Sequence, residues 1–181
     1  MANKYCLPMC KILDVDVEKF RVPVGYTFYP GDVVKLETLD TGLSNNLEVY
    51  SPTPLATAST DRLCIVINQG FEHLSDGRRP AGNPDITTYS YPAGETVTAI
   101  RLRTNYPFHI SYDCLDNTGS VSPAIGVYLV GQVGDYQLAT ASSFTTERQV
   151  LKIEKLETVK TGGQFGVASI NAVIARVIEG Y

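Results

Sequence analysis

Short segments rich in Val, Ile and Thr, separated by turns that contain Pro and Gly, run through the chain and constrain its fold most strongly. Val and Ile are stiff at χ1 and fit a pleated sheet better than a helix. Residues 63–67, Leu-Cys-Ile-Val-Ile, form an unbroken apolar run bounded by polar residues. Such a run predicts a short strand buried on both faces.

Two similar phrases, residues 29–36 and 91–102, each predict a turn that leads into a strand. Both begin with Tyr-Pro, pass through a Gly followed by an acid, and continue with β-branched residues. Pro sets the φ angle of the turn, and Gly supplies the positive φ that can follow it.

The N-terminal segment predicts an arm followed by a first strand. Within residues 11–20, apolar side chains alternate with three acids, Asp14, Asp16 and Glu18. A period of two places the acids together, so we expect a strand with one wet, acidic face. The first ten residues resemble an arm with no core of its own. Residues 1–20 are therefore expected to form the N-terminal arm and first strand.

The C-terminal third fits either a helical or a strand period. Residues 150–159 and 167–178 are rich in Val and Ile, and Gly162-Gly163 between them is typical of a hairpin turn, which favours strands. We therefore expect an all-β fold, a barrel or sandwich of about eight to ten strands, with residues 21–181 as a single β-domain. Residues 71–90 hold two Pro and two Gly with little periodicity and predict one long surface loop.

The charge balance argues against nucleic acid as a partner. The formal net charge is -4 and the pI is near 5.1, whereas phosphate binding needs clustered Lys and Arg. The locally basic residues, Arg78, Arg79, Arg101 and Arg103, are too few for a groove. The start of the chain lacks the apolar stretch of a signal peptide, and no run has the length of a membrane span. We expect a chain made and kept in a cytosol, with thiols rather than disulfides.

Charged residues make up 19% of the chain, below the roughly 25% typical of soluble domains. Such a surface is either kept in solution by uncharged polar residues or partly covered by partner chains.

Candidate nucleophiles and metal ligands are few. Of the two histidines, His73 falls in the predicted loop, while His109 and Cys114 are too far apart along one strand to form a catalytic pair. Cys6 and Cys10 have a spacing that zinc sites tolerate, but there is no second close pair among the remaining ligands. Cys64 and Cys114 are typical of small buried hydrophobes, and Cys6 and Cys10 are candidates for an interface.

The three acids of residues 14–18 invite a calcium interpretation, but the Gly-containing loop of a dedicated calcium site is missing. An exposed acidic face that discourages edge-to-edge aggregation explains them better. The sequence also contains no common catalytic motif. We therefore assign no catalytic, cofactor-binding or metal residues and expect no enzyme activity.

Tyrosine is abundant, with eleven copies and no Trp. Tyr gives rigid, amphipathic contact area, so a glycan or peptide site near the long loop is one interpretation. The other is that Tyr is simply a good strand residue with one wet end. The tyrosines close to the loop in sequence are Tyr89, Tyr91, Tyr106 and Tyr112.

The chain resembles the capsid decoration, or cement, proteins of tailed bacteriophages in three features. These are the short arm, the Tyr-Pro-Gly-Asp-Val-Val phrase at 29–34 and the strand-rich end from 150 through Gly162-Gly163 to 178. The resemblance implies a virion structural protein that binds the outside of an assembled shell, bridges capsid subunits and stabilises the capsid.

Its implied partners are the major capsid protein and copies of itself, often as a trimer, with no nucleic acid, membrane or cofactor. Its implied location is the capsid surface of the virion, after synthesis in the host cytoplasm. An arm such as residues 1–20 would add a strand to a neighbour's open sheet edge. The alternative is a β-rich receptor- or glycan-binding module of a virion or cell surface.

Overall fold

A computed structural model describes residues 4–40, 49–57, 61–68, 90–116, 121–145, 147–163 and 166–179. Within these ranges the chain is all-β, as predicted, with twelve strands and no α-helix. Twelve exceeds the expected eight to ten because strands of two or three residues carry no periodic signal. The predicted loop at 71–90 lies outside the described residues, except for Ser90.

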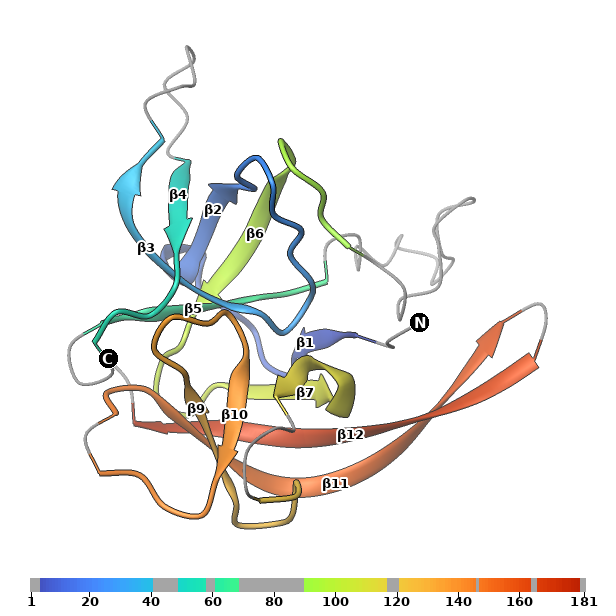
Figure 1. Cartoon of the computed structure of the whole chain (residues 1–181). Helices are drawn as coiled ribbons and strands as arrows, with labels where there is room; N and C mark the ends of the chain where they lie inside the picture. Colours follow the sequence, from blue (N-terminus) through green and yellow to red (C-terminus); the bar gives the residue numbers. More distant parts are fainter. Residues whose placement is uncertain are drawn as a thin grey trace.

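Five strands close into a small barrel that contains the two similar turn phrases (Figure 1). Around the barrel the strand order is β2 (Val17–Arg21), β4 (Tyr50–Thr53), β3 (Val33–Leu39), β5 (Leu63–Val66) and β6 (Thr96–Arg101). Gly31 and Gly94, one from each phrase, both have positive φ, so the predicted turns are confirmed. Each barrel strand has a hydrogen-bonded neighbour on both sides.

The other seven strands form one open, curled sheet beside the barrel (Figure 1). Its order is β1 (Cys6–Pro8), β7 (Pro107–Ser111), β12 (Gly166–Glu179), β11 (Val150–Gly163), β9 (Tyr128–Gly131), β10 (Leu138–Ala141) and β8 (Leu115–Asp116). The strands favoured for the C-terminal third are confirmed as the long hairpin β11–β12.

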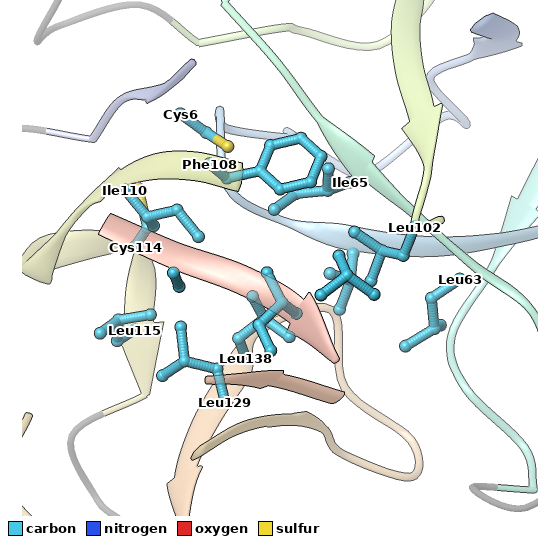
Figure 2. Close-up of a cluster of buried hydrophobic side chains, with 14 of the residues drawn as sticks. Cys6, Leu63, Ile65, Leu102, Phe108, Ile110, Cys114, Leu115, Leu129 and Leu138 are labelled. Atoms are coloured by element: carbon cyan, nitrogen blue, oxygen red, sulfur yellow. The ribbon is translucent and has the colours of Figure 1, made fainter. Parts of the chain in front are cut away.

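The largest hydrophobic core lies between the barrel and the open sheet (Figure 2). Strand β5 shows how the sequence builds it, because its four residues are all buried and point alternately to two clusters. Leu63 and Ile65 join the core shared with the open sheet, and Cys64 and Val66 join a second cluster with the barrel residues. The predicted strand with two buried faces is therefore confirmed, and it forms the wall common to both halves.

The N-terminal segment differs from the predicted arm. Strand β1 pairs antiparallel with β7 of the same chain, and Tyr5 and Cys6 are buried. Residues 14–16 form a short 3-10 helix, η1 (Asp14–Asp16), rather than part of an alternating strand, so β2 begins only at Val17. A second 3-10 helix, η3 (Tyr112–Cys114), follows β7.

Candidate functional site

The predicted acidic face is not formed. Val15 is 65% exposed while Asp16 is only 1% exposed, because the 3-10 turn rotates the side chains out of the strand alternation. One carboxylate oxygen of Asp16 accepts a hydrogen bond from Arg103 Nη2 at 2.7 Å, and the other accepts one from the Tyr106 hydroxyl at 2.6 Å. Glu18 forms an ion pair with Arg101 on β6. Asp16 therefore ties the start of β2 to the segment leading into β7, whereas Glu18 joins two strands of the barrel.

The side chains of Cys114 and His109 are held in the fold by hydrogen bonds and burial. The buried thiol of Cys114 donates to the carbonyl oxygens of Pro30 at 3.0 Å and Tyr5 at 3.3 Å, and burial raises its pKa to about 12. A nucleophilic cysteine requires the thiolate, so this thiol acts as a hydrogen-bond donor. His109 Nε2 lies 3.2 Å from the Tyr5 hydroxyl and 3.4 Å from Glu157, and burial lowers its pKa. His73 lies outside the described residues.

The other three cysteines are also free thiols in different environments. Cys6 lies in the shared core, and Cys64, as predicted, is buried in the barrel cluster, whereas Cys10 is exposed. Burial raises the pKa of Cys64 to about 12. Among the described residues, no group of three or more His, Cys, Asp or Glu side chains is arranged to hold a metal ion. Nor does the described part contain a helix with the length and apolarity needed to cross a membrane.

The described tyrosines near the predicted loop do not form an exposed surface. Tyr91 is fully buried and donates its hydroxyl to the Ile67 carbonyl, and Tyr106 binds Asp16. Tyr112 is partly buried, and Tyr89 lies outside the described residues. Exposed tyrosines occur instead in the turn before β3, where Tyr26 is 52% exposed and Tyr29 is 37% exposed.

This exposed turn lies beside the β9–β10 loop and Lys4. The Tyr26 ring meets Tyr136 edge-on at 6.0 Å, and the Lys4 amino group lies 4.6 Å from the centre of the Tyr29 ring. This surface was not among the predicted sites. The signal was present in residues 22–31, where three aromatic residues are crowded between Pro23 and Pro30.

Strand β1 is held on both edges of its backbone. On one side, Tyr5 N–H donates to Ser111 Oγ, Ser111 N–H donates to Tyr5 O, and Met9 N–H donates to Pro107 O. On the other side, Cys6 N–H donates to Asn68 Oδ1 at 2.8 Å, and Asn68 N–H donates to Cys6 O at 3.1 Å. We call the space between β7 and Asn68 the β1 slot.

The hairpin β11–β12 continues well beyond its neighbours in the sheet. Strand β9 pairs only with residues 150–152 of β11, and β7 pairs only with residues 172–176 of β12. Residues 158–163 and 166–171, here called the projecting ribbon, pair only with each other in the described part of the chain. Figure 1 shows them reaching away from the barrel and the rest of the sheet.

No protein-family model, curated protein or solved structure matches this chain. Its function must therefore be argued from its own geometry. Two features of the described residues suit contact with other molecules, namely the projecting ribbon and the β1 slot. Both belong to the open sheet.

Proposed function

We propose that this chain is a virion structural protein that decorates an assembled phage capsid and stabilises it by bridging capsid subunits. The observation that carries the proposal is the projecting ribbon. A two-stranded hairpin without further support is only marginally stable in water. An extension in which neither strand has a third partner among the described residues therefore suits a protein whose ribbon is completed by a neighbouring subunit.

The backbone of the ribbon supports this role. Beyond the short pairing with β9 and the backbone hydrogen bonds of Ile153 with Gly126 and Val127, the outer edge of β11 carries main-chain N–H and C=O groups that pair with no described strand. Such an edge can accept an extended segment of another protein through main-chain hydrogen bonds. Each contact of this kind is modest, but a symmetric shell presents many copies, and multivalency then strengthens attachment without new kinds of contact.

The proposed partners are the major capsid protein and other copies of the chain, as a trimer, on the outer surface of the capsid, after synthesis in the host cytoplasm. The proposal involves no catalysis, cofactor, nucleic acid or membrane. Three buried thiols, those of Cys6, Cys64 and Cys114, have pKa values raised by burial, and they fit this proposal because they serve as packing and hydrogen-bonding groups.

The test uses shells assembled from the major capsid protein that the proposal expects to be encoded near this chain's gene. Purified chain is mixed with the shells and sedimented, and the temperature at which the shells break is followed by light scattering. We expect the chain to co-sediment and to raise that temperature. Failure to bind the shells would overturn the proposal.

A ribbon variant makes the test specific. Replacing residues 160–169 with Asn-Gly joins the paired residues Val159 and Ile170 by a two-residue hairpin turn and leaves the body intact. We expect this variant to stay folded but to lose most shell binding. The matched control is Val24→Ser, on a residue that is 92% exposed in a barrel turn, and it should bind like the unaltered chain.

A second candidate function, a receptor- or glycan-binding module, is favoured by the exposed pair Tyr26 and Tyr29. Exposed aromatic rings offer rigid surfaces on which a sugar ring can stack. A glycan array probed with the oligomeric protein tests this. Binding that disappears in Tyr26→Ala would support a glycan site, and an array without any signal would exclude it for the glycans printed.

A further inference from the structure

The strand β1 is bound by its slot much as a separate peptide would be. Its alternating backbone groups face β7 on one side and the Asn68 side chain and backbone on the other. The thiol of Cys114 adds a third contact to Tyr5 O. Recognition of this kind reads an extended backbone and does not require the strand to come from the same chain.

The side chains of β1 are also recognised on both faces. Cys6 is fully buried and packs in the shared core with Phe108 and Ile110 (Figure 2). On the opposite face, Tyr5 and Leu7 pack with Ile170 and Ala172 of β12. The two faces together select a short segment with a small residue between two larger apolar ones.

An empty slot would be costly. Asn68 is 6% exposed, and Ser111 and Cys114 are fully buried. Withdrawing β1 would take one hydrogen-bond partner from each of these side chains and would uncover the core residues against which Cys6 packs, and both losses are unfavourable. A form with an occupied slot is therefore favoured over one with an empty slot.

The connection that follows β1 is short and exposed. Met9, Cys10 and Lys11 all face solvent, and Met9 is 50% exposed although it is apolar. Pro8 precedes them and fixes one backbone angle at the start of the connection. Beyond it, Ile12 packs against the shared core and marks where the body begins. A short, exposed hinge between a strand and the body on which it packs is the arrangement that favours exchange of that strand between copies.

We propose that the β1 slot accepts the β1 strand of a second copy of this chain, so that neighbouring copies are linked by exchanged N-terminal strands. The exchanged and closed forms contain the same contacts within the slot and differ only at residues 9–11. Their balance is therefore set by the hinge and by local protein concentration. The linkage goes beyond shell binding and does not depend on it.

Cross-linking between two chains that carry different cysteine substitutions tests the strand exchange in the absence of any shell. Leu7 lies directly opposite His109 in the β1–β7 register. With Cys10→Ser as background, one chain carries Leu7→Cys and the other carries His109→Cys. The two are mixed at several protein concentrations and then oxidised with oxidised glutathione. We expect a disulfide-linked heterodimer whose yield rises with concentration.

Two controls give the result its meaning. The Leu7→Cys chain mixed with a Thr98→Cys chain should give no heterodimer, because Thr98 lies in the barrel opposite Lys19. The double variant Leu7→Cys/His109→Cys should cross-link within itself at low concentration, which shows that the two thiols meet in the folded protein. Internal cross-linking of the double variant without heterodimer from the mixed single variants would overturn the proposal.

A second measurement decides the question even if the disulfide forms poorly. Native mass spectrometry compares the unaltered chain with a variant that has Gly-Gly-Ser inserted after Lys11. Lengthening the hinge relieves its constraint and favours the closed form, so oligomers formed by exchange should decline several-fold. A chain that stays monomeric at every concentration, or oligomers that the insertion leaves unchanged, would contradict strand exchange.

Discussion

The barrel and the open sheet satisfy their backbones in different ways. Every barrel strand lies between two others, so the barrel has no free edge. The open sheet ends in β1 on one side and β8 on the other, and β11 and β12 extend beyond their neighbours. Closure removes the places where another chain can add a strand. We therefore expect the open sheet to make contacts with other molecules and the barrel to support the open sheet.

The two halves are nevertheless not independent. The barrel has an inner cluster that includes Phe20, Phe28 and Tyr91, but the larger core is built jointly. Ile65 and Ile100 from barrel strands pack there with Leu151 and Val173 of the open sheet. The barrel therefore acts as a wall on which the open sheet is assembled, and both should fold as one unit.

The largest predicted effect tests this joint core. Ile65→Ala removes a fully buried side chain from the wall between the halves and should lower the free energy of unfolding by about 2–5 kcal/mol. Urea denaturation followed by circular dichroism should show one cooperative transition at lower urea. The control Ile125→Ala, at a residue 68% exposed, should change stability by less than about 0.5 kcal/mol. Two separate transitions would show that the halves unfold independently.

A second prediction concerns the buried carboxyl at the junction between the halves. Asp32 lies in the turn before β3, where burial raises its pKa from 3.8 to about 7 although it accepts a hydrogen bond from Tyr29 N–H. Because the folded state holds this proton more tightly than the unfolded state, the contribution of Asp32 is fully present below about pH 4. It is lost as the pH rises through about 7.

Asp32→Asn stays neutral and keeps an oxygen acceptor for Tyr29 N–H. Its stability relative to the unaltered chain should therefore increase from pH 4 to pH 8, by on the order of 2–4 kcal/mol. Urea denaturation of both proteins across this range measures the difference at each pH. A stability difference that does not change with pH would mean that Asp32 titrates near its ordinary value.

A third, smaller prediction compares the cost in stability of adding a methyl group at the glycine of each Tyr-Pro turn. Gly31 and Gly94 have φ angles of 92° and 89°, but a Cβ at Gly31 would lie 2.6 Å from Cys114 Cβ, whereas a Cβ at Gly94 would meet nothing within 4 Å. Gly94→Ala should cost only the backbone strain, about 1–2 kcal/mol. Gly31→Ala should cost about 1–3 kcal/mol more, because it also pushes the barrel turn against the open sheet.

Thermal unfolding of the two alanine variants side by side provides the measurement. Equal losses in both would show that the contact between Gly31 and Cys114 is loose enough to yield.

Much of this fold follows from local patterns in the sequence. The unbroken apolar run at 63–67 and the Val-rich segments of the C-terminal third predicted strands correctly, because burial and side-chain shape act within each segment. The division into a barrel and an open sheet was not predictable, since it depends on pairings such as β2 with β6 that join distant residues. No local pattern distinguishes strands that close from strands that do not.

The candidate surfaces were harder to predict for the same reason. The first ten residues lack periodicity because β1 is short, and its binding depends on Asn68 and Ser111, far along the chain. The projecting ribbon follows from strand lengths that exceed those of β7 and β9, which is a property of the assembled sheet. The alternation around Asp16 misled because one turn of 3-10 helix reversed which side chains face solvent.

The smallest predicted effect is on stability, and it compares two neighbouring acids of the 3-10 turn, one buried and one exposed. Asp16→Asn replaces the buried carboxylate that accepts hydrogen bonds from Arg103 and Tyr106. The weaker hydrogen bonds should lower the free energy of unfolding by about 1–2 kcal/mol, and the loss stays this small because Arg103 is partly exposed to water. Asp14→Asn changes an exposed side chain and should stay within about 0.5 kcal/mol of the unaltered chain. Urea denaturation near pH 7 compares the two variants. If their losses were equal, Asp16 would not tie the barrel to the segment that enters β7, and the shared hydrophobic core would be the main link between the two halves.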